Sequence, residues 1–436
     1  MRLDINNLGI IRKAEIDVDG ITVIAGSNNT GKSTVGKVIF ALFNSLNDME
    51  NKVLAQRTSS IRTLCHRAIR NVLVHGTALG ELSRPTTSRA LSSSRNITEL
   101  IMENASDKSD ISVDFIRDIV DDALVRIKAK FAPDEIDELV NEIYSGVYEV
   151  LHLPDKTISQ ALVSRYFQDV FNDQINTLHK NEPAVVNLNL KKRNIAINFL
   201  NHECVSLDSE ISILHKALYI ANTSPLDQLD EEGYGTNYSV TESPLVRYLS
   251  EQYHNDDNQI IESVLASEKM DAIFSMLSSV VKGRILVKDG NYCLKDEDTN
   301  QSIFVKNLST GLKAFVLMKM LFEGGVIGYN DVLILDEPEI HLHPEWQIVY
   351  AELIVLLQKH LNLSVVVTTH SPYFLDAIDL FSRKHGIEKT TNYYLSKLVG
   401  TQVEFKKVSD CIDAIYKEMA SPIDILETLR FELTEE

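Results

Sequence analysis

The chain of 436 residues has few cysteines and no long apolar run. Its four cysteines, Cys65, Cys204, Cys293 and Cys411, are far apart and form no CxxC pair, which excludes a zinc hook and a disulfide framework and predicts reduced thiols. No stretch of about 18 apolar residues is present, so we expect no transmembrane helix. The first 20 residues carry charges throughout and lack an apolar core, which argues against a signal peptide. These absences predict a cytoplasmic protein with no membrane partner.

Positive charge is also scarce, since 43 lysines and arginines face 62 aspartates and glutamates and the formal net charge is −19. This balance excludes a generic nucleic-acid binder. One segment reverses it, because Glu81 is the only acid among seven arginines: Arg57, Arg62, Arg67, Arg70, Arg84, Arg89 and Arg95. Two interpretations stay open for this segment. It is either a surface for a nucleic-acid backbone or an acidic partner, or a solvated helix face whose arginines pair with acids elsewhere.

A glycine loop lies between a predicted strand and a predicted helix. Leu3–Ala25 alternates apolar and polar residues and ends in an apolar run, which predicts strands, and Ser33–Leu46 is predicted to be a helix. The sequence GSNNTGKST between them fits the phosphate-loop pattern GxxxxGK[ST]. Amides around the glycines can face phosphates, Lys32 can reach the β- and γ-phosphates, and Ser33 can ligate Mg²⁺. We therefore expect ATP to be bound by Gly26, Asn28, Asn29, Thr30, Gly31, Lys32, Ser33 and Thr34.

Two acidic residues follow a second apolar strand. Val332–Leu335 has the pattern of a buried strand, and Asp336 and Glu337 come directly after it. An aspartate at a strand end can bind Mg²⁺, and the next carboxylate can orient and deprotonate an attacking water. The alternative is that two acids merely begin a loop. Beside a phosphate loop we favour the catalytic interpretation.

Histidines occur in two places near these acids. His370 follows the apolar strand Val365–Val367, where an imidazole can hydrogen-bond the γ-phosphate, although a histidine at a strand end can also be purely structural. His341 and His343 form an HxH pair with Glu339 nearby. A metal site is the less favoured interpretation of that pair. We expect these two histidines to shape the loop after Glu337 by hydrogen bonding and packing.

The fourth segment is NLSTGLK, Asn307–Lys313. Ser309, Thr310 and Gly311 come directly before the apolar stretch Leu312–Phe322, which predicts a helix with a polar N-terminal cap. Spacing alone leaves open whether this segment does more than cap a helix.

Together the four segments resemble the ABC-type ATPase head of the SMC, RecF and OLD-like group of AAA ATPases. NLSTGLK resembles the signature LSGGQ, with Thr310 in place of the first glycine, and LILDEPEIHLHPEWQ and TTHSPYFL resemble the Walker B and switch-histidine segments of OLD-like ATPases. The resemblance implies an α/β P-loop fold in which Ser309 and Gly311 of one protomer face the γ-phosphate bound by Lys32 of another. The glutamine of the family's Q-loop has no clear match, and Gln56 is the nearest after the phosphate loop.

The motifs lie at the two ends of the chain, which predicts a split core. We expect a mixed-sheet ATPase core in residues 1–46 and 283–436, with further core strands within 185–222. A large helical insertion is expected at 47–184 and a helical segment at 223–282. Within these, 185–200 is predicted to form a hairpin, Ala217–Ile220 a strand, 283–308 strands with a DG turn, and 86–96 a mobile loop.

The leading hypothesis is an ATP-hydrolysing switch that forms a homodimer or higher oligomer around nucleotide. OLD proteins carry a nuclease domain after the ATPase, whereas only about 65 residues follow Pro372 here, so we expect a separate effector protein, a nuclease or toxin, in bacterial antiphage defence. One alternative is a RecF- or SMC-like DNA repair or recombination ATPase that binds DNA through the arginines between 57 and 95. The other is a scaffold that binds ATP with little turnover.

Overall fold

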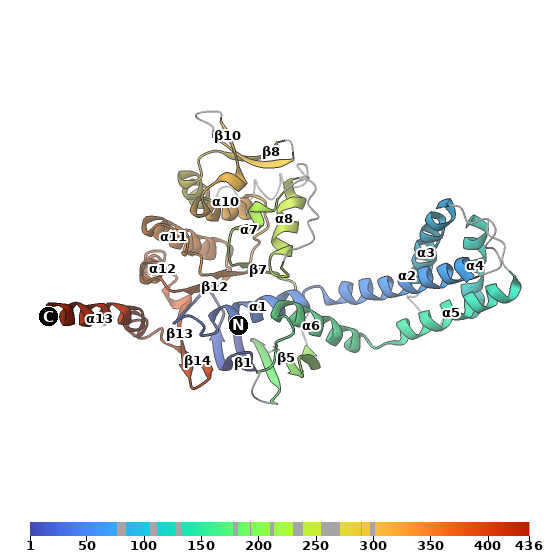
Figure 1. Ribbon diagram of the computed structural model, residues 1–436, viewed down its shortest axis with the longest axis horizontal. Helices are drawn as coiled ribbons and strands as arrows, with labels where there is room; N and C mark the ends of the chain where they lie inside the picture. The colour runs from blue at the N-terminus through green and yellow to red at the C-terminus, as the bar shows by residue number, and fades with distance from the viewer. Residues whose placement is uncertain are drawn as a thin grey trace. The chain divides into compact units, whose positions relative to one another are not determined.

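A computed structural model describes residues 1–75, 84–104, 111–127, 132–177, 182–191, 193–209, 213–229, 239–253, 271–288, 290–296 and 301–435. The chain divides into two compact units (Figure 1). Unit 1 combines Met1–Asn47 with Leu162–Glu436, and unit 2 is Asp48–Ala161. None of the helices in the described ranges combines the length and hydropathy that a membrane span requires.

Unit 1 is built on a mixed sheet of eleven strands in the order β6-β5-β4-β1-β2-β14-β13-β3-β12-β11-β7. Five neighbouring strands are parallel: β13 (Thr391–Val399), β3 (Ile21–Ala25), β12 (Ser364–Thr369), β11 (Val332–Asp336) and β7 (Ala217–Ile220). The remaining strands are β1 (Arg2–Leu8), β2 (Ile11–Asp17), β4 (Ala184–Leu190), β5 (Arg193–Leu200), β6 (Glu203–Ser209) and β14 (Gln402–Lys407). The expected α/β fold with a mixed sheet is confirmed, as are the hairpin of β4 and β5 and the strand β7.

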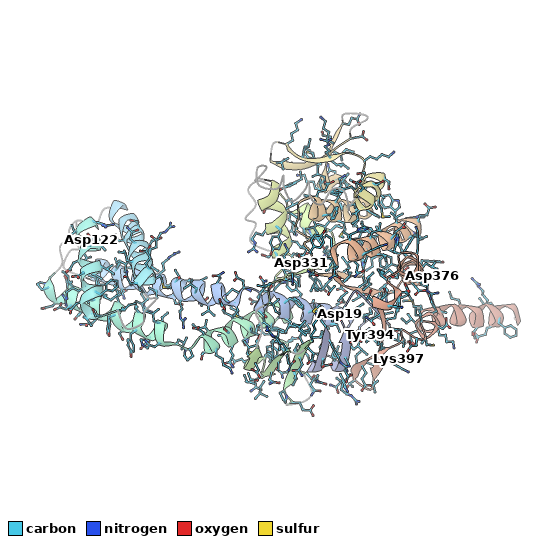
Figure 2. All side chains as sticks on the ribbon, turned by 180° about the vertical axis from the view of Figure 1, so that it is seen from behind. Asp19, Asp122, Asp331, Asp376, Tyr394 and Lys397 are labelled. Carbon is cyan, nitrogen blue, oxygen red and sulfur yellow. The ribbon has the colours of Figure 1, made fainter. Side chains whose placement is uncertain are left out.

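Burial explains which strands lie at the centre of the sheet. Every residue of β3 and β12 is buried, as expected for parallel strands covered on both faces. In β2, buried and exposed residues are interspersed, so one face of that strand remains accessible. Tyr394 of β13, labelled in Figure 2, links the two regions, because its hydroxyl accepts a hydrogen bond from Asp17 N–H at the end of β2, 2.8 Å away.

Unit 1 also contains helices. They include α1 (Lys32–Leu46), α6 (Asp155–Phe171), α7 (Ser224–Asp227), α8 (Ser243–Tyr253), α10 (Thr310–Glu323), α11 (Pro344–Leu361), α12 (Pro372–Lys384) and α13 (Asp413–Glu435). Of these, α1, α10, α11 and α12 pack beside the parallel strands, and α6 packs on β5 and β6. The largest apolar cluster lies between the sheet and α10 and α11. Phe315 and Tyr350 meet edge to face there, with ring centroids 5.2 Å apart. Burying each such ring stabilises the fold by about 1.5–3 kcal/mol.

A small antiparallel sheet leads into α10. It consists of β8 (Arg284–Lys288), β9 (Asn291–Lys295) and β10 (Ser302–Phe304), and a 3₁₀ turn at Val305–Asn307 connects it to the helix. The strands predicted between 283 and 308 are therefore confirmed, whereas Asp289 of the predicted DG turn lies outside the described residues. Ile285, Tyr292 and Leu294 join the main apolar cluster, so this sheet is part of unit 1.

Unit 2 has its own core between four helices. They are α2 (Met49–His75), α3 (Arg84–Asn104), α4 (Val113–Ile127) and α5 (Pro133–His152). Ile61 and Cys65 of α2, Ile101 of α3, Ile116 of α4 and Ile143 of α5 are buried together. A Cβ at Gly146 of α5 would lie 1.9 Å from Leu64 Cδ1, so α2 and α5 approach closely at this glycine.

The prediction of a mobile loop at 86–96 was wrong, because this serine-rich segment is helical in α3. Ser93, Ser94 and Thr98 are buried, and Thr98 Oγ1 donates to Ser94 O one turn earlier at 2.8 Å. Such back-bonding satisfies a hydroxyl within a helix. Ile97 and Ile101 supply the buried apolar face. Tertiary burial therefore outweighs the low intrinsic helix propensity of the serines.

Candidate ATP site

The phosphate loop is shaped by residues with positive φ. Gly26, Asn29 and Gly31 have φ of 151°, 59° and 70°. A Cβ at Gly26 would lie 2.1 Å from Ser396 Oγ on β13, which leaves no room for a side chain. Thr30 closes the loop, since its hydroxyl donates to Ser27 O at 2.7 Å and lies 2.6 Å from Ser396 Oγ. The glycines thus set the curvature of the loop, and Ser396 of β13 supports it.

Lys32 lies inside this loop. It is 4% exposed, and its Nζ donates to Gly26 O at 3.1 Å and Ser27 O at 2.9 Å. Burial lowers the pKa of Lys32, while the nearby carboxylates of Glu337 and Asp336 act in the opposite direction. Its ammonium is therefore directed to the place where the loop can receive a phosphate.

The start of α1 fits an anion. Gly31 is the N-cap and offers no side-chain cap, and the first turn, which contains Ser33 and Thr34, has no acidic residue. The first N–H groups of a helix lack partners within the helix, and the positive end of its dipole lies there. Asn28 and Asn29 are exposed at the tip of the loop. The residues present therefore suit a nucleotide phosphate chain.

Asp336 is held by three hydroxyl groups. Its Oδ1 accepts from Ser33 Oγ at 3.0 Å and from Thr368 Oγ1 at 2.6 Å, and its Oδ2 accepts from Tyr219 OH at 2.6 Å. A carboxylate and a hydroxyl this close are the oxygen ligands that Mg²⁺ prefers. The structure thus brings together the two residues predicted to bind the metal, Ser33 and Asp336.

Glu337 and His370 are in direct contact. The carboxylate Oε1 of Glu337 meets His370 Nε2, and the same oxygen lies 3.7 Å from Lys32 Nζ. Glu337 has φ of 53°, an uncommon conformation for a residue with a side chain, and its N–H is bonded to Thr368 O at 3.1 Å. The backbone at the end of β11 is thus held in this conformation by its bond to β12.

Ser309 and Gly311 lie beside the loop after Glu337. Ser309 Oγ accepts from Leu312 N at 3.4 Å, so the predicted helix cap is confirmed. A Cβ at Gly311 would lie 3.0 Å from His341 O. Within the described ranges, no hydrogen bond or ion pair joins Ser309 or Gly311 to the phosphate loop of the same chain. A cavity of about 50 Å³ lies between the start of α10 and Glu337, lined in part by Thr310.

The HxH pair occupies the same loop. His341 and His343 are exposed, and His343 is the N-cap of α11. The Glu339 side chain is instead buried and bonded to Thr369 and His370. The three side chains thus do not converge on one point.

Sequence reasoning missed three residues of the site, because none stands in a motif that assigns it a role. Tyr219 lies on β7, Ser396 on β13, and Thr368 within the TTHSP segment, where only His370 was singled out. Each reaches the site because its strand neighbours the strand that carries a motif. The only sequence signal available was that polar residues occur inside strands that are otherwise apolar.

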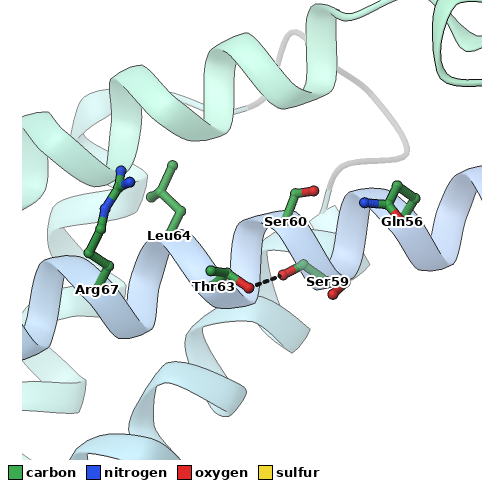
Figure 3. A pocket seen from close by; sticks show the side chains of 6 residues that line it. All are labelled: Gln56, Ser59, Ser60, Thr63, Leu64 and Arg67. Atoms are coloured by element: carbon green, nitrogen blue, oxygen red, sulfur yellow. Dashed lines mark hydrogen bonds between the residues drawn. The ribbon is translucent and has the colours of Figure 1, made fainter. Parts of the chain in front are cut away.

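The arginines of unit 2 are largely paired where their side chains are described. Arg57 donates to Val150 O and Leu153 O and pairs with Asp155, while Arg67 lies 3.8 Å from Glu142 and Arg95 lies 3.0 Å from Glu99. Arg62 and Arg70 are exposed, and the side chains of Arg84 and Arg89 lie outside the described residues. A cavity of about 330 Å³ lies on α2, and Figure 3 shows the side chains that line it: Gln56, Ser59, Ser60, Thr63, Leu64 and Arg67.

Comparisons with known proteins identify what the chain is similar to. The AAA ATPase domain family matches residues 1–375. Septu protein PtuA of Bacillus thuringiensis is 27% identical over 165 residues, which cover 34% of this chain and 41% of that protein, so the chain spans less than half of this relative's length.

Two solved structures of SMC heads also overlay on the chain. An SMC head bound to the C-terminal winged-helix domain of ScpA shares 11% identity at a TM-score of 0.42, covering 93% of this chain and 96% of that one. The SMC head domain from Thermotoga maritima shares 12% identity at a TM-score of 0.36, covering 93% and 98%. Since the family match extends over most of the sequence and includes the phosphate loop, Asp336, Glu337 and His370, the chain belongs to the AAA ATPase domain family.

Proposed function

We propose that this protein is a cytoplasmic, ATP-hydrolysing switch that closes as a dimer or higher oligomer around nucleotide and controls a separate effector. One observation carries the proposal. Lys32, Ser33, Asp336, Glu337 and His370 converge where β3, β11 and β12, three adjacent parallel strands, reach their carboxyl ends. Ligands bind at this edge in open α/β sheets.

Each group has a distinct part in hydrolysis. Lys32 and the first amides of α1 bind the phosphates, and Ser33 and Asp336 hold Mg²⁺, which neutralises phosphate charge when bound. Glu337 orients a water and accepts its proton, since its carboxylate lies beside Lys32 and His370. His370, in contact with Glu337, hydrogen-bonds the γ-phosphate.

Closure between two chains is supported by the position of the signature segment. Ser309 is exposed at the N-terminus of α10, where a helix end can meet an anion from another chain. In the resembling ATPase heads, the corresponding residues contact the nucleotide of the partner. We extend that role to Ser309 and Gly311.

The biological setting is a further part of the proposal. The OLD-like motifs and the partial similarity to Septu protein PtuA support a place in bacterial antiphage defence. We propose that residues 1–46 and 283–436, with strands from 185–222, form the ATPase core. The helical insertion at 47–184 is then the proposed region for partners, whereas the helical segment at 223–282 contributes residues such as Leu245 and Ile273 to the core of unit 1. We do not assign nucleic-acid binding to the arginines between 57 and 95, because three of them are paired with acids.

Two measurements test the proposal. Phosphate release should be abolished in Lys32→Ala, which loses nucleotide binding, and in Glu337→Gln, which retains ATP and accumulates as a dimer on size-exclusion chromatography with light scattering. Lys359→Ala, at an exposed lysine of α11, is the matched control and should behave as wild type. Normal turnover in Glu337→Gln would contradict the role of Glu337, and a monomeric Glu337→Gln protein with ATP bound would contradict closure.

A further inference from the structure

A buried carboxylate joins the loop after Glu337 to the start of α12. Glu339 is 4% exposed, and its Oε1 accepts three hydrogen bonds: from Thr369 Oγ1, from His370 N–H at 2.9 Å and from Ser371 N–H at 3.3 Å. Three donors on one oxygen fix its position closely. The carboxylate therefore determines where the chain turns from β12 into α12.

Opposing influences act on this carboxylate. Burial raises the pKa of Glu339, while the donors from Thr369, His370 and Ser371 act in the opposite direction. Ser371 is the N-cap of α12, so the positive end of that helix dipole also favours the ionised form. Glu339 Oε2 is buried and has no hydrogen-bond partner among the described residues. The link between loop and helix thus depends on Oε1.

Gln347 of α11 provides a second link between the same two segments. Its Nε2 donates to Leu342 O at 3.1 Å and to Glu339 O at 3.4 Å. Its Oε1 accepts from Ser371 Oγ at 2.7 Å. The loop and the N-terminus of α12 are therefore connected both through Glu339 and through Gln347.

These contacts close a ring around the proposed catalytic pair. Glu337 Oε1 touches the His370 side chain, the His370 backbone is bonded to Glu339, and Glu339 is two residues after Glu337 in the chain. Displacing Glu339 must therefore change the relation between Glu337 and His370. The next residue, Ile340, is 60% exposed, so a contact made at the surface of the loop acts directly beside this ring.

We propose that Glu339 is a positioning residue. It holds Glu337 and His370 in the relative position that hydrolysis needs, and when the loop moves at Ile340, it moves these two residues as well. This rests on the proposed ATPase function and adds a mode of regulation to the same site. Glu339 does not touch the phosphates in this mechanism. It controls the hydrolysis step and leaves nucleotide binding to the phosphate loop.

The test separates binding from hydrolysis. Glu339→Ala should lower the single-turnover hydrolysis rate 10- to 100-fold, while the Kd for a fluorescent ATP analogue changes less than threefold. Glu339→Gln keeps an oxygen that can accept the same three donors and should recover most of the rate. Glu339→Asp keeps the charge but is shorter by one methylene, so it should fall between them. Rescue by Gln and the split between Kd and rate distinguish positioning from general destabilisation.

Glu345→Ala is the matched control, because Glu345 is an exposed acid in the first turn of α11. It should retain the wild-type rate and Kd. Wild-type hydrolysis by Glu339→Ala, or equal losses in binding and hydrolysis, would overturn the proposal. If Glu339→Ala does not fold, a wild-type rate in Glu339→Asp would overturn it equally. Failure of the wild type to hydrolyse ATP would instead refute the underlying function.

Discussion

Removing the hydroxyl of Tyr219 should raise the Mg²⁺ concentration that the ATPase needs. Tyr219 OH donates to Asp336 Oδ2 at 2.6 Å and is the only described side chain bonded to that oxygen. Burial, with Asp336 nearby, raises the pKa of Tyr219, so the phenol stays protonated and remains a donor throughout the usable pH range. Tyr219→Phe keeps the ring in its place and deletes only this bond.

The magnitude follows from the kind of bond that is lost. A hydrogen bond to a charged group contributes about 1.5–3 kcal/mol, and about 1.4 kcal/mol corresponds to a factor of ten in affinity. Loss of a group that orients a metal ligand costs 10- to 100-fold in comparable sites. Because Thr368 and Ser33 still hold Asp336 Oδ1, we expect the lower end, a rise of about tenfold in the Mg²⁺ concentration at half-maximal rate.

The assay is steady-state phosphate release over a Mg²⁺ titration at saturating ATP. Tyr393→Phe is the matched control, because Tyr393 also donates to a carboxylate, that of Asp379, at 3.3 Å and is likewise buried. It should lower thermal stability by an amount similar to Tyr219→Phe but leave the Mg²⁺ midpoint unchanged. An unchanged midpoint in Tyr219→Phe, or equal shifts in both variants, would refute the role assigned to Tyr219.

Three further outcomes are expected. Gly26→Ala should abolish binding of a fluorescent ATP analogue, since the added Cβ meets Ser396 Oγ; tight binding by this variant would contradict the loop geometry. Arg57→Ala should lower the free energy of unfolding of unit 2 by about 1–3 kcal/mol in urea melts, because it removes bonds to two carbonyls and to Asp155, and an unchanged midpoint would count against this role. In native protein at pH 8, Cys411 should react with a thiol reagent while Cys65, whose pKa burial raises to about 12, stays unmodified. Fast labelling of Cys65, located by peptide mass spectrometry, would contradict this.

Local patterns explain what the sequence predicted correctly. The phosphate loop, the strand before Asp336 and the cap at Ser309 each depend on residues that are close in the chain, and the structure has the expected strand, loop and helix at each. The prediction for residues 86–96 was wrong because the structure of this segment depends on contacts between residues far apart in the chain. Its helix is stabilised by burial of Ile97 and Ile101 against other helices, which composition does not reveal.

The partners of the site depend on sheet register, which no local pattern contains. Ser396 lies 366 residues from Thr30, and Tyr219 lies 117 residues from Asp336. The order of the strands brings both pairs of residues together, since β13 pairs with β3 and β7 pairs with β11. A polar residue inside an apolar strand can be noticed in the sequence, but its target becomes known only when the neighbouring strand is known.

The two threonines of the TTHSP segment show how one strand serves two different parts of the site. Thr368 is paired with Asp336 across β11 and β12 and bonds its carboxylate on the face of the sheet that α1 covers. Side chains alternate along a strand, so Thr369 points to the opposite face, where its hydroxyl donates to Glu339. A slip of one residue between β11 and β12 would exchange these faces and separate both carboxylates from their donors. The register of these two strands therefore fixes the proposed metal ligand and the positioning carboxylate together.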